Sequence, residues 1–523
     1  MILLLMVYQL IRLVAFIEVY GGIEHDGGWM LSISRSLAEQ GTYTTMVSTI
    51  VDPTVIGGID VDRKFNIQAA DGRIWFFTGN GIGPGSIIPD AVIIWLFGSG
   101  FWALRAGPLL FYLLFLGLGS LILYRLSGLP AVLLWHAFLF FYPHLSVFLG
   151  YEAMGEVPTM VYILGAYLLL AGAMAHSEAR PRHFFLAGVV GGLAINTKLI
   201  ALWSVGGAGL AAVVPWLMGR YRQYRRQRAV NPGLTFKKLS LWGIGVLSVL
   251  GLWEAVHLVI LNWLAGFEMY RQHTWQRFQF VLDDGSGVGL RIHSGPEFFW
   301  DKFFLLSEVT HPQRPIVAIL FVFLLVGGGW LIWRRWGEIY AQTLVISIWG
   351  GWLLNTIWFV TLAKTGWPRH FWFGMVLATM LLSLLGSELL KTYPVALRRS
   401  WQQWGTWGIR VTFWILILWS FAGQQYVRSF FISDEIVPYW QQKQHENKYD
   451  ASLPWVLIPR QQQQAVVDYI NQMPAEAHVY YPANHKVAEI PPQTGRLHYP
   501  LNRRQFMNQH PADIVVIGPS LVS

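Results

Sequence analysis

Residues 219–238 read GRYRQYRRQRAVNPGLTFKK, a polar stretch with many Arg and Lys and no acidic side chain. Long apolar runs flank it on both sides. Basic segments between apolar spans mark the cytoplasmic loops of membrane proteins. The stretch therefore predicts a membrane protein and fixes the side from which its other helices can be counted.

The composition supports this prediction, because 54% of the 523 residues are hydrophobic and only 13% are charged. Apolar runs of about 17 to 25 residues, each able to cross the membrane core as a helix, recur from Met1 to about Phe421. We expect the first run to be retained as a helix, because no small-residue cleavage site follows it. The net charge of +9 comes largely from basic loops between these runs, so we expect no nucleic-acid partner.

Counting outward from the basic stretch places the later segments on alternate sides of the membrane. The expected helices after the stretch are 239–265 outward, 316–333 inward, 341–362 outward, 371–390 inward and 411–423 outward. The polar segment 266–313 then lies outside, while Arg334 and Arg335 lie in the cytoplasm. If residues 1–20 run outward, the loop 21–84 is also outside.

Two arrangements remain open between residues 85 and 217. Five crossings by the apolar runs near 86–104, 107–124, 130–149, 155–175 and 184–217 give about eleven helices in all. That count leaves Arg125 and the stretch EARPRH, residues 178–183, outside, against the positive-inside preference. The alternative breaks the last run at the tripeptide NTK, residues 196–198, and makes an earlier segment re-entrant.

The composition changes after residue 423, where glutamine-rich and alternating segments replace the apolar runs. The four glutamines at 461–464 are expected to begin a helix, and several short segments are typical of strands. We therefore expect an all-α multi-pass membrane domain over 1–425, with interfacial helices in its first outer loop. A small outward-facing α/β domain over 426–523 would follow it.

The first outer loop begins with IEHDGGWMLSISRSLAEQGTYTT, residues 23–45, in which Glu24, His25 and Asp26 come together where the first span ends. Apolar and polar side chains then alternate at helical spacing, which is typical of a helix lying in the membrane interface. Asp26 stands where an N-cap would stand, and capping alone would explain it. Partial desolvation at the membrane surface would also raise the pKa of its carboxyl and make it a better base.

Asp26 and Met30, followed by SRSLAEQGTY at 34–43, resemble the first outer loop of the GT-C glycosyltransferases that use polyprenyl-phosphate sugars. The similarity is greatest to the protein O-mannosyltransferases and the lipid A aminoarabinose transferases. Those families have an Asp-Glu pair with an aromatic residue four positions after the Asp, where this chain has Gly27 and Met30. The second carboxylate is therefore either missing or supplied by Glu24.

Further motifs resemble the same superfamily in their order along the chain, to about residue 425. The glycine- and proline-rich stretch from Asp71 resembles the family's entry to the second helix, and Arg105 its short arginine-containing turn. Lys198 in NTKLIAL matches a Thr-Lys pair before an apolar run. Arg369 and His370 in GWPRHFWFGM resemble the motif that begins a late outer helix.

The resemblance implies an inverting transfer in which Asp26 is the general base and Lys198, Arg369 and His370 hold the donor phosphate. Snorkelling of Lys198 or anchoring of a helix end by Arg369 and His370 would be the structural explanation of the same side chains. Residues that could line the active site are Glu24, His25, Arg105, Glu156, Glu254 and His257. Each of the last three could instead cap a helix or form a structural polar pair within the membrane.

The expected partners are a polyprenyl-phosphate sugar donor, a lipid, glycan or protein acceptor, and membrane lipids. We expect no cofactor and assign no metal, because Asp52, Asp60 and Asp62 border the stretch VDPTVIGG, which is typical of a hairpin. The expected location is the plasma (inner) membrane, with the active site and the C-terminal domain outside the cytoplasm. The alternative functions are a transporter or flippase of lipid-linked saccharides and an inactive scaffold related to the enzymes.

Overall fold

A computed structural model describes most of the membrane part of the chain and portions of its outer segments. The described residues are 1–20, 25–46, 54–56, 59–61, 67–68, 73–76, 83–141, 155–176, 180–226, 236–279, 314–363, 368–391, 460–481, 490–496, 498–500 and 512–515. The helix expected at 411–423 lies outside them.

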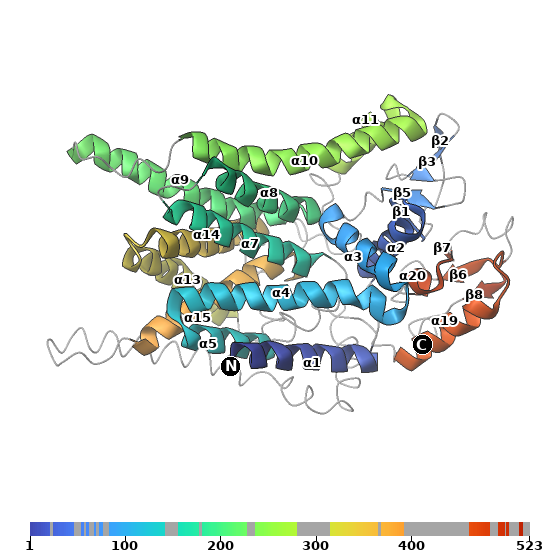
Figure 1. Ribbon diagram of the computed structural model, residues 1–523, viewed down its shortest axis with the longest axis horizontal. Helices are drawn as coiled ribbons and strands as arrows, with labels where there is room; N and C mark the ends of the chain where they lie inside the picture. Colours follow the sequence, from blue (N-terminus) through green and yellow to red (C-terminus); the bar gives the residue numbers. More distant parts are fainter. Residues whose placement is uncertain are drawn as a thin grey trace.

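Long helices run side by side along one direction and form a bundle, and the short elements gather at one end of it (Figure 1). The helices of the bundle are α1 (Ile2–Tyr20), α4 (Phe101–Ser127), α5 (Leu129–Phe141), α7 (Glu156–Ala175), α8 (Pro181–Thr197), α9 (Ala201–Arg226), α10 (Phe236–Ala265), α13 (Arg314–Arg334), α14 (Ile339–Thr361) and α15 (Trp372–Lys391). Four of them match the expected spans after residue 238 to within a few residues.

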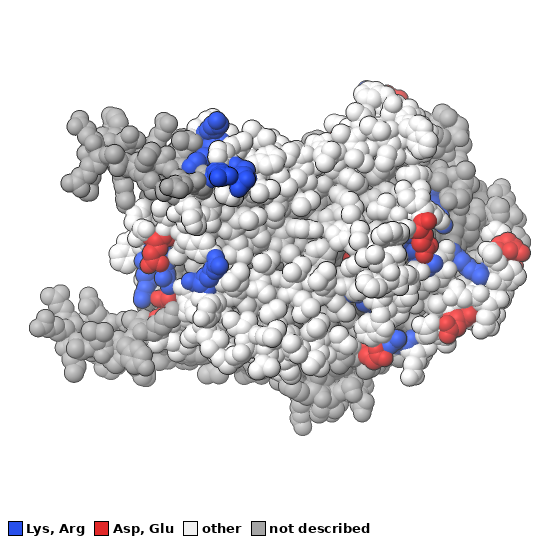
Figure 2. Space-filling model, in the orientation of Figure 1, with Lys and Arg blue, Asp and Glu red and all other residues white. Residues whose placement is uncertain are grey.

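Among the residues that the structure describes, six helices, α4, α7, α10, α13, α14 and α15, are long and apolar enough to cross a membrane. On the face shown in Figure 2, the coloured charged side chains lie toward the two ends, with a broad uncharged belt between them. Hydrocarbon cannot hydrate charge, so this belt is where a bilayer would lie. The chain is an integral membrane protein, while the count of eleven spans stays a prediction.

Polar contacts at one end of the bundle show which arrangement holds between residues 85 and 217. Arg125 donates to Tyr340 Oη at 2.7 Å, and Arg335 donates to the carbonyl of Leu126 at 2.7 Å. Arg125 therefore lies at the same end as Arg335, the end that the sequence assigns to the cytoplasm. The first arrangement, with Arg125 outside, is wrong.

The alternative arrangement, with a break at NTK and an earlier segment that does not cross, agrees with the structure. The long run breaks at NTK, because α8 ends at Thr197 and α9 begins at Ala201. Segment α3 (Pro84–Phe97) has only 14 residues and is too short to cross about 30 Å of hydrocarbon as a helix. The start of α8 also lies beside the basic stretch, since Lys238 sits 5.8 Å from the ring of Phe184. Both changes move basic residues to the expected side.

The first outer loop contains α2 (His25–Gln40) and a five-stranded antiparallel sheet. Its strands are β1 (Thr44–Thr45), β2 (Thr54–Ile56), β3 (Ile59–Val61), β4 (Ile67–Gln68) and β5 (Ile74–Trp75), in the order β1-β5-β4-β3-β2. The expected hairpin around 54–61 is present as β2 and β3, with Thr54 opposite Val61. Helix α11 (Phe267–Gln279) lies at the same end (Figure 1).

The C-terminal segment also lies at this end (Figure 1). It contains α19 (Arg460–Gln472), α20 (Ile490–Thr494) and a parallel sheet of β6 (Val479–Tyr481), β7 (His498–Pro500) and β8 (Ile514–Val515) in the order β7-β6-β8. The expected helix at the four glutamines is thus α19. Domain boundaries at 425 and 426 lie outside the described residues.

Glycines allow α8 and α10 to pack closely along their length. Gly188 and Gly192 are four residues apart on α8 and face α10, an arrangement that lets membrane helices approach backbone to backbone. A Cβ at Gly188 would overlap the carbonyl oxygen of Trp242, whereas a Cβ at Gly243 would meet nothing within 4 Å.

We therefore expect Gly188→Ala to lower the free energy of unfolding by about 1–3 kcal/mol, because the helices must separate. Gly243→Ala is the matched control and should leave stability unchanged or raise it, since Ala favours helix. Thermal unfolding of both variants in the same detergent measures the difference. Equal midpoints for the two variants would contradict close packing at Gly188.

His498 of β7 is buried, and this burial, with the charge of Arg496, lowers the pKa of its imidazole to about 3. The unfolded chain has a value of about 6.5. The folded state thus prefers neutral His498. The folded state keeps its full stability above pH about 6.5, and it loses stability as the pH falls toward 3, because protons then bind His498 more strongly in the unfolded chain.

We expect the C-terminal segment to become more sensitive to protease as the pH falls from about 7 to about 5. His498→Gln should weaken that pH dependence, because it removes the titrating group. Cleavage rates within 460–500 at several pH values, with a protease calibrated on an unstructured peptide, measure the effect. An unchanged pH slope in the variant would show that another group controls it.

Candidate functional site

A buried ion pair lies where α7 begins and α8 ends. The Nζ atom of Lys198 donates to Oε1 of Glu156, and only 2% of the Glu156 side chain is exposed. The second carboxylate oxygen of Glu156 has no hydrogen-bond partner among the described residues. The Lys198 side chain is 17% exposed, so the pair is less buried on the lysine side than on the glutamate side. The sequence named both residues, but it did not predict that they pair.

The local sequence explains how these side chains are placed. Glu156 is in the first turn of α7, where a carboxylate interacts favourably with the helix dipole. Lys198 is the C-cap of α8 and leaves the helix with φ −150° and ψ 118°, which turns the chain toward α9. The break at NTK thus carries Lys198 to the end of the bundle rather than burying it within a span.

The start of α3 completes one wall of this region. The Gly83 backbone N–H donates to the carbonyl of Thr197 at 3.3 Å, and Tyr162 of α7 donates to the carbonyl of Gly85 at 2.7 Å. A Cβ at Gly85 would overlap the hydroxyl of Thr197. The glycine-rich entry that the sequence singled out therefore lets α3 approach the turn that holds Lys198.

Helix α2 approaches the ion pair from the other side. The Met30 methyl group lies 3.6 Å from the position that a Cβ on Gly155 would occupy. Gly155 directly precedes Glu156, and Met30 is one helical turn after Asp26. The candidate base is thus carried on the helix that packs beside the Glu156–Lys198 pair. The side chains of His25 and Asp26, and all of Glu24, lie outside the described residues.

The serines on the polar side of α2 are buried, whereas a helix lying in the membrane interface would expose them. Ser32, Ser34 and Ser36 are fully buried. Ser32 Oγ lies 2.8 Å from Thr45 Oγ1, and Ser34 donates to the carbonyl of Met30 at 3.0 Å. Glu39 on the polar side is exposed, so the expected polar face is present in part, and β1 and the C-terminal segment cover the rest. Asp26 is also not the N-cap, since α2 already begins at His25.

The structure places Arg105 and His370 at this end of the bundle but outside the ion pair. Arg105 is fully buried near the start of α4, with its guanidinium 5.3 Å from the ring centroid of Phe101. His370 is buried in the 3-10 helix η4 (Pro368–Phe371), between α14 and α15. The side chain of Arg369 lies outside the described residues.

Glu254 and His257 belong to a separate cluster. Glu254 accepts hydrogen bonds from Tyr270 Oη at 3.0 Å and Thr274 Oγ1 at 3.2 Å, both on α11. The His257 ring lies 4.4 Å from that of Phe76 and 6.0 Å from that of His273. These contacts join α10 to α11 and to the first outer loop.

Sequence reasoning missed Asp90, which is buried in α3 with Oδ1 unpartnered among the described residues. A single acid within the apolar run SIIPDAVIIW was the available signal, because such residues are costly to bury. No group of three or more possible metal ligands occurs in the part of the chain that the structure describes.

No protein-family model and no curated protein matches this chain. Among solved structures it is similar to ArnT from Cupriavidus metallidurans bound to undecaprenyl phosphate, at 14% identity and a TM-score of 0.53, covering 99% of this chain and 90% of ArnT. The apo state of ArnT gives 14% identity and 0.51, covering 99% and 93%.

The oligosaccharyltransferase of Archaeoglobus fulgidus is matched at 13% identity over 96% of this chain and 64% of that protein, with a TM-score of 0.44. At 14% identity the likeness to ArnT concerns the fold alone. The resemblance to GT-C proteins stated from the sequence is thereby confirmed as a similarity of fold.

The Glu156–Lys198 ion pair should affect the free energy of unfolding. Lys198→Met would leave the Glu156 carboxylate buried without its cation, which we expect to cost about 3–5 kcal/mol. Glu156→Met together with Lys198→Met removes both charges, and the double variant should recover most of that loss. Unfolding of the two single variants and the double variant in detergent gives the coupling energy. Additive losses would contradict a direct pair.

Proposed function

We propose that this chain is a membrane glycosyltransferase that moves a sugar from a polyprenyl-phosphate donor to an acceptor at the outer membrane face, with inversion. The observation that carries the proposal is the buried Glu156–Lys198 pair beside α2. A partly exposed cation at the end of a membrane bundle suits a phosphate whose lipid chain stays in the bilayer. The GT-C-like fold supports the same assignment.

The proposed reaction is a single displacement. An acceptor hydroxyl or amine attacks the anomeric carbon while the bond from that carbon to the phosphate oxygen breaks. Asp26 takes the acceptor proton, and the polyprenyl phosphate leaves with the bonding electrons. Lys198, Arg369 and His370 stabilise the charge that develops on the phosphate.

The Glu156–Lys198 contact prepares the site for this step. Glu156 fixes the position of the ammonium before the donor arrives, so little reorganisation is needed when the phosphate charge develops. We propose no cofactor besides the lipid-linked donor. We also propose the plasma membrane as the location, with the site and the C-terminal segment on the outer side.

We expect Asp26→Asn to abolish transfer of radiolabelled sugar from synthetic polyprenyl-phosphate sugars to membrane acceptors, because loss of a general base typically costs about 10²–10⁴-fold. Asp468→Asn on α19 is the matched control, since it removes an exposed carboxylate far along the chain from the site. Donor binding by both variants should equal that of the wild type.

Equal transfer by the wild type and Asp26→Asn would assign the base to another residue. If the purified wild type transfers no sugar from any donor, the transporter or the inactive scaffold becomes the better hypothesis. Uptake of a fluorescent lipid-linked saccharide into proteoliposomes then separates these two.

A further inference from the structure

The C-terminal segment contacts one face of α2, the helix that carries the candidate base. Trp29, Ser32 and Arg35, which are spaced three residues apart on α2, carry these contacts. Trp29 packs against the buried cluster of α19, which includes Val467 and Ile470. Asp26 lies nine residues before Arg35, which is two and a half helical turns, so the two positions lie on opposite sides of α2.

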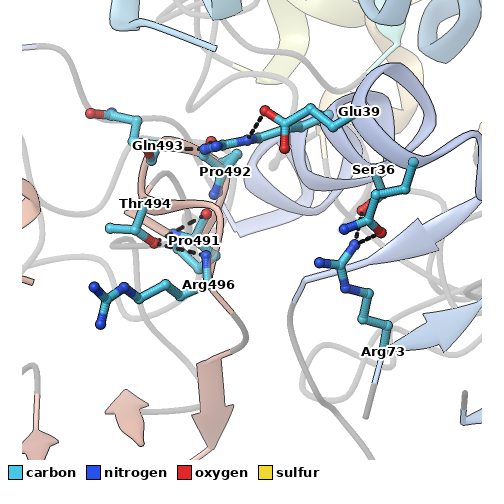
Figure 3. Close-up of polar contacts among 10 residues, drawn as sticks. Ser36, Glu39, Arg73, Pro491, Pro492, Gln493, Thr494 and Arg496 are labelled. Carbon is cyan, nitrogen blue, oxygen red and sulfur yellow. Dashed lines mark hydrogen bonds and ion pairs between the residues drawn. The ribbon is translucent and has the colours of Figure 1, made fainter. Parts of the chain in front are cut away.

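Arg35 makes the central contact of this interface, and Figure 3 labels its partners Glu39, Pro492 and Gln493. Its Nη1 donates to the carbonyls of Pro492 at 2.6 Å and Gln493 at 3.0 Å, while Nε donates to Glu39 at 2.7 Å. The two carbonyls belong to α20, and the last carbonyls of a helix have no partner within it. The guanidinium thus meets the two carbonyls through Nη1 and the Glu39 carboxylate through Nε, two nitrogen positions that the single nitrogen of a lysine cannot occupy together.

The residue that follows α20, Gly495, leaves room for the Arg35 side chain. Gly495 has φ +69°, a conformation that favours glycine, and a Cβ there would overlap the guanidinium of Arg35. A glycine at this position therefore serves both the turn after α20 and the approach of Arg35.

A second connection runs through the first outer loop. The backbone N–H of His498 donates to the carbonyl of Met46 at 3.0 Å, and the Met46 N–H donates to Ser32 Oγ at 3.4 Å. The C-terminal segment thus reaches α2 directly at Arg35 and through β1 at Ser32.

The segment is also anchored to the bundle independently of α2. Arg460, where α19 begins, forms an ion pair with Glu18 of α1. Its guanidinium lies 4.3 Å from the ring of Phe101 and 5.3 Å from that of Trp102, both on α4. Because one end is held by α1 and α4, the contacts at Arg35 can fix the rotation of α2 relative to the membrane helices.

We propose that Arg35 is a positioning residue: through the carbonyls of Pro492 and Gln493 it fixes the rotation of α2 and so the orientation of position 26 beside Glu156 and Lys198. This inference rests on the proposed function of Asp26. Helix α2 also packs against α3, and its Leu31 belongs to a buried cluster with Ile94 of α3 and Leu104 of α4. Helix α2 is therefore held both by the membrane helices and by the C-terminal segment, and loss of the second contact should let it rotate without unfolding the bundle.

The test compares Arg35→Gln, Arg35→Lys and Gly495→Ala in the full chain, with Arg271→Gln on α11 as the matched control. Arg271 is exposed and pairs only locally with Glu268 in the described structure. We expect the first three to lower kcat by about tenfold to a hundredfold with little change in the donor KM, because misplacement by about 1 Å can cost this much. The control should be unaffected, and Lys should not rescue Arg35.

The double variant Arg35→Gln/Gly495→Ala tests whether the two residues act through one contact. Its loss should equal that of either single variant, because the same contact is broken once. Independent, multiplying losses would overturn the proposal, as would an unchanged kcat in Arg35→Gln.

Hydrogen exchange over 25–40 supplies a readout that does not depend on transfer. We expect faster exchange in Arg35→Gln and Gly495→Ala and no change in Arg271→Gln. Unchanged exchange in the first two overturns the positioning role even if transfer falls. If exchange rises as expected but the wild type transfers no sugar from any donor, the contact stands and the proposed function fails.

Discussion

The hydrocarbon core of a membrane offers peptide groups no water to bond, and this constraint decides the architecture of the chain. Each crossing segment must satisfy its backbone within a helix, and the helices must then associate without a hydrophobic driving force. Close approach at glycines such as Gly188 and Gly207 supplies that association. All described strands and the polar helices α2, α11, α19 and α20 lie at one end of the bundle (Figure 1).

The same constraint explains why the site takes the form of a turn. An ammonium within a span would have to be desolvated, whereas a lysine at a helix C-cap can pair with a buried carboxylate and still present one side to a ligand. The break between α8 and α9 provides this position for Lys198. Gly83 and Gly85 at the start of α3 allow its backbone to pack directly against Asn196 and Thr197, next to Lys198. Membrane topology and site geometry therefore depend on the same few residues.

The sequence predicted the spans after residue 238 because each is a continuous apolar run bounded by basic residues. It could not choose between two arrangements before that point, since the run 184–217 has no charge besides Lys198 to mark where it folds back. The pairing of Glu156 with Lys198 was also invisible, because the two residues are distant in sequence and belong to different helices. The burial of Ser32, Ser34 and Ser36 depends on covering elements that helical periodicity does not describe.

The packing of α2 bears on the Glu that follows the Asp in the similar families and that Gly27 replaces here. Gly27 and Gly28 are buried in the first turn of α2, so a longer acidic side chain there would be desolvated. A carboxylate is nevertheless close to this helix, because Met30 lies against the residue that precedes Glu156. Glu156 comes from α7 rather than from the first loop, and its charge is matched by Lys198. Glu156 stands at the start of a helix, so its position does not depend on the first outer loop.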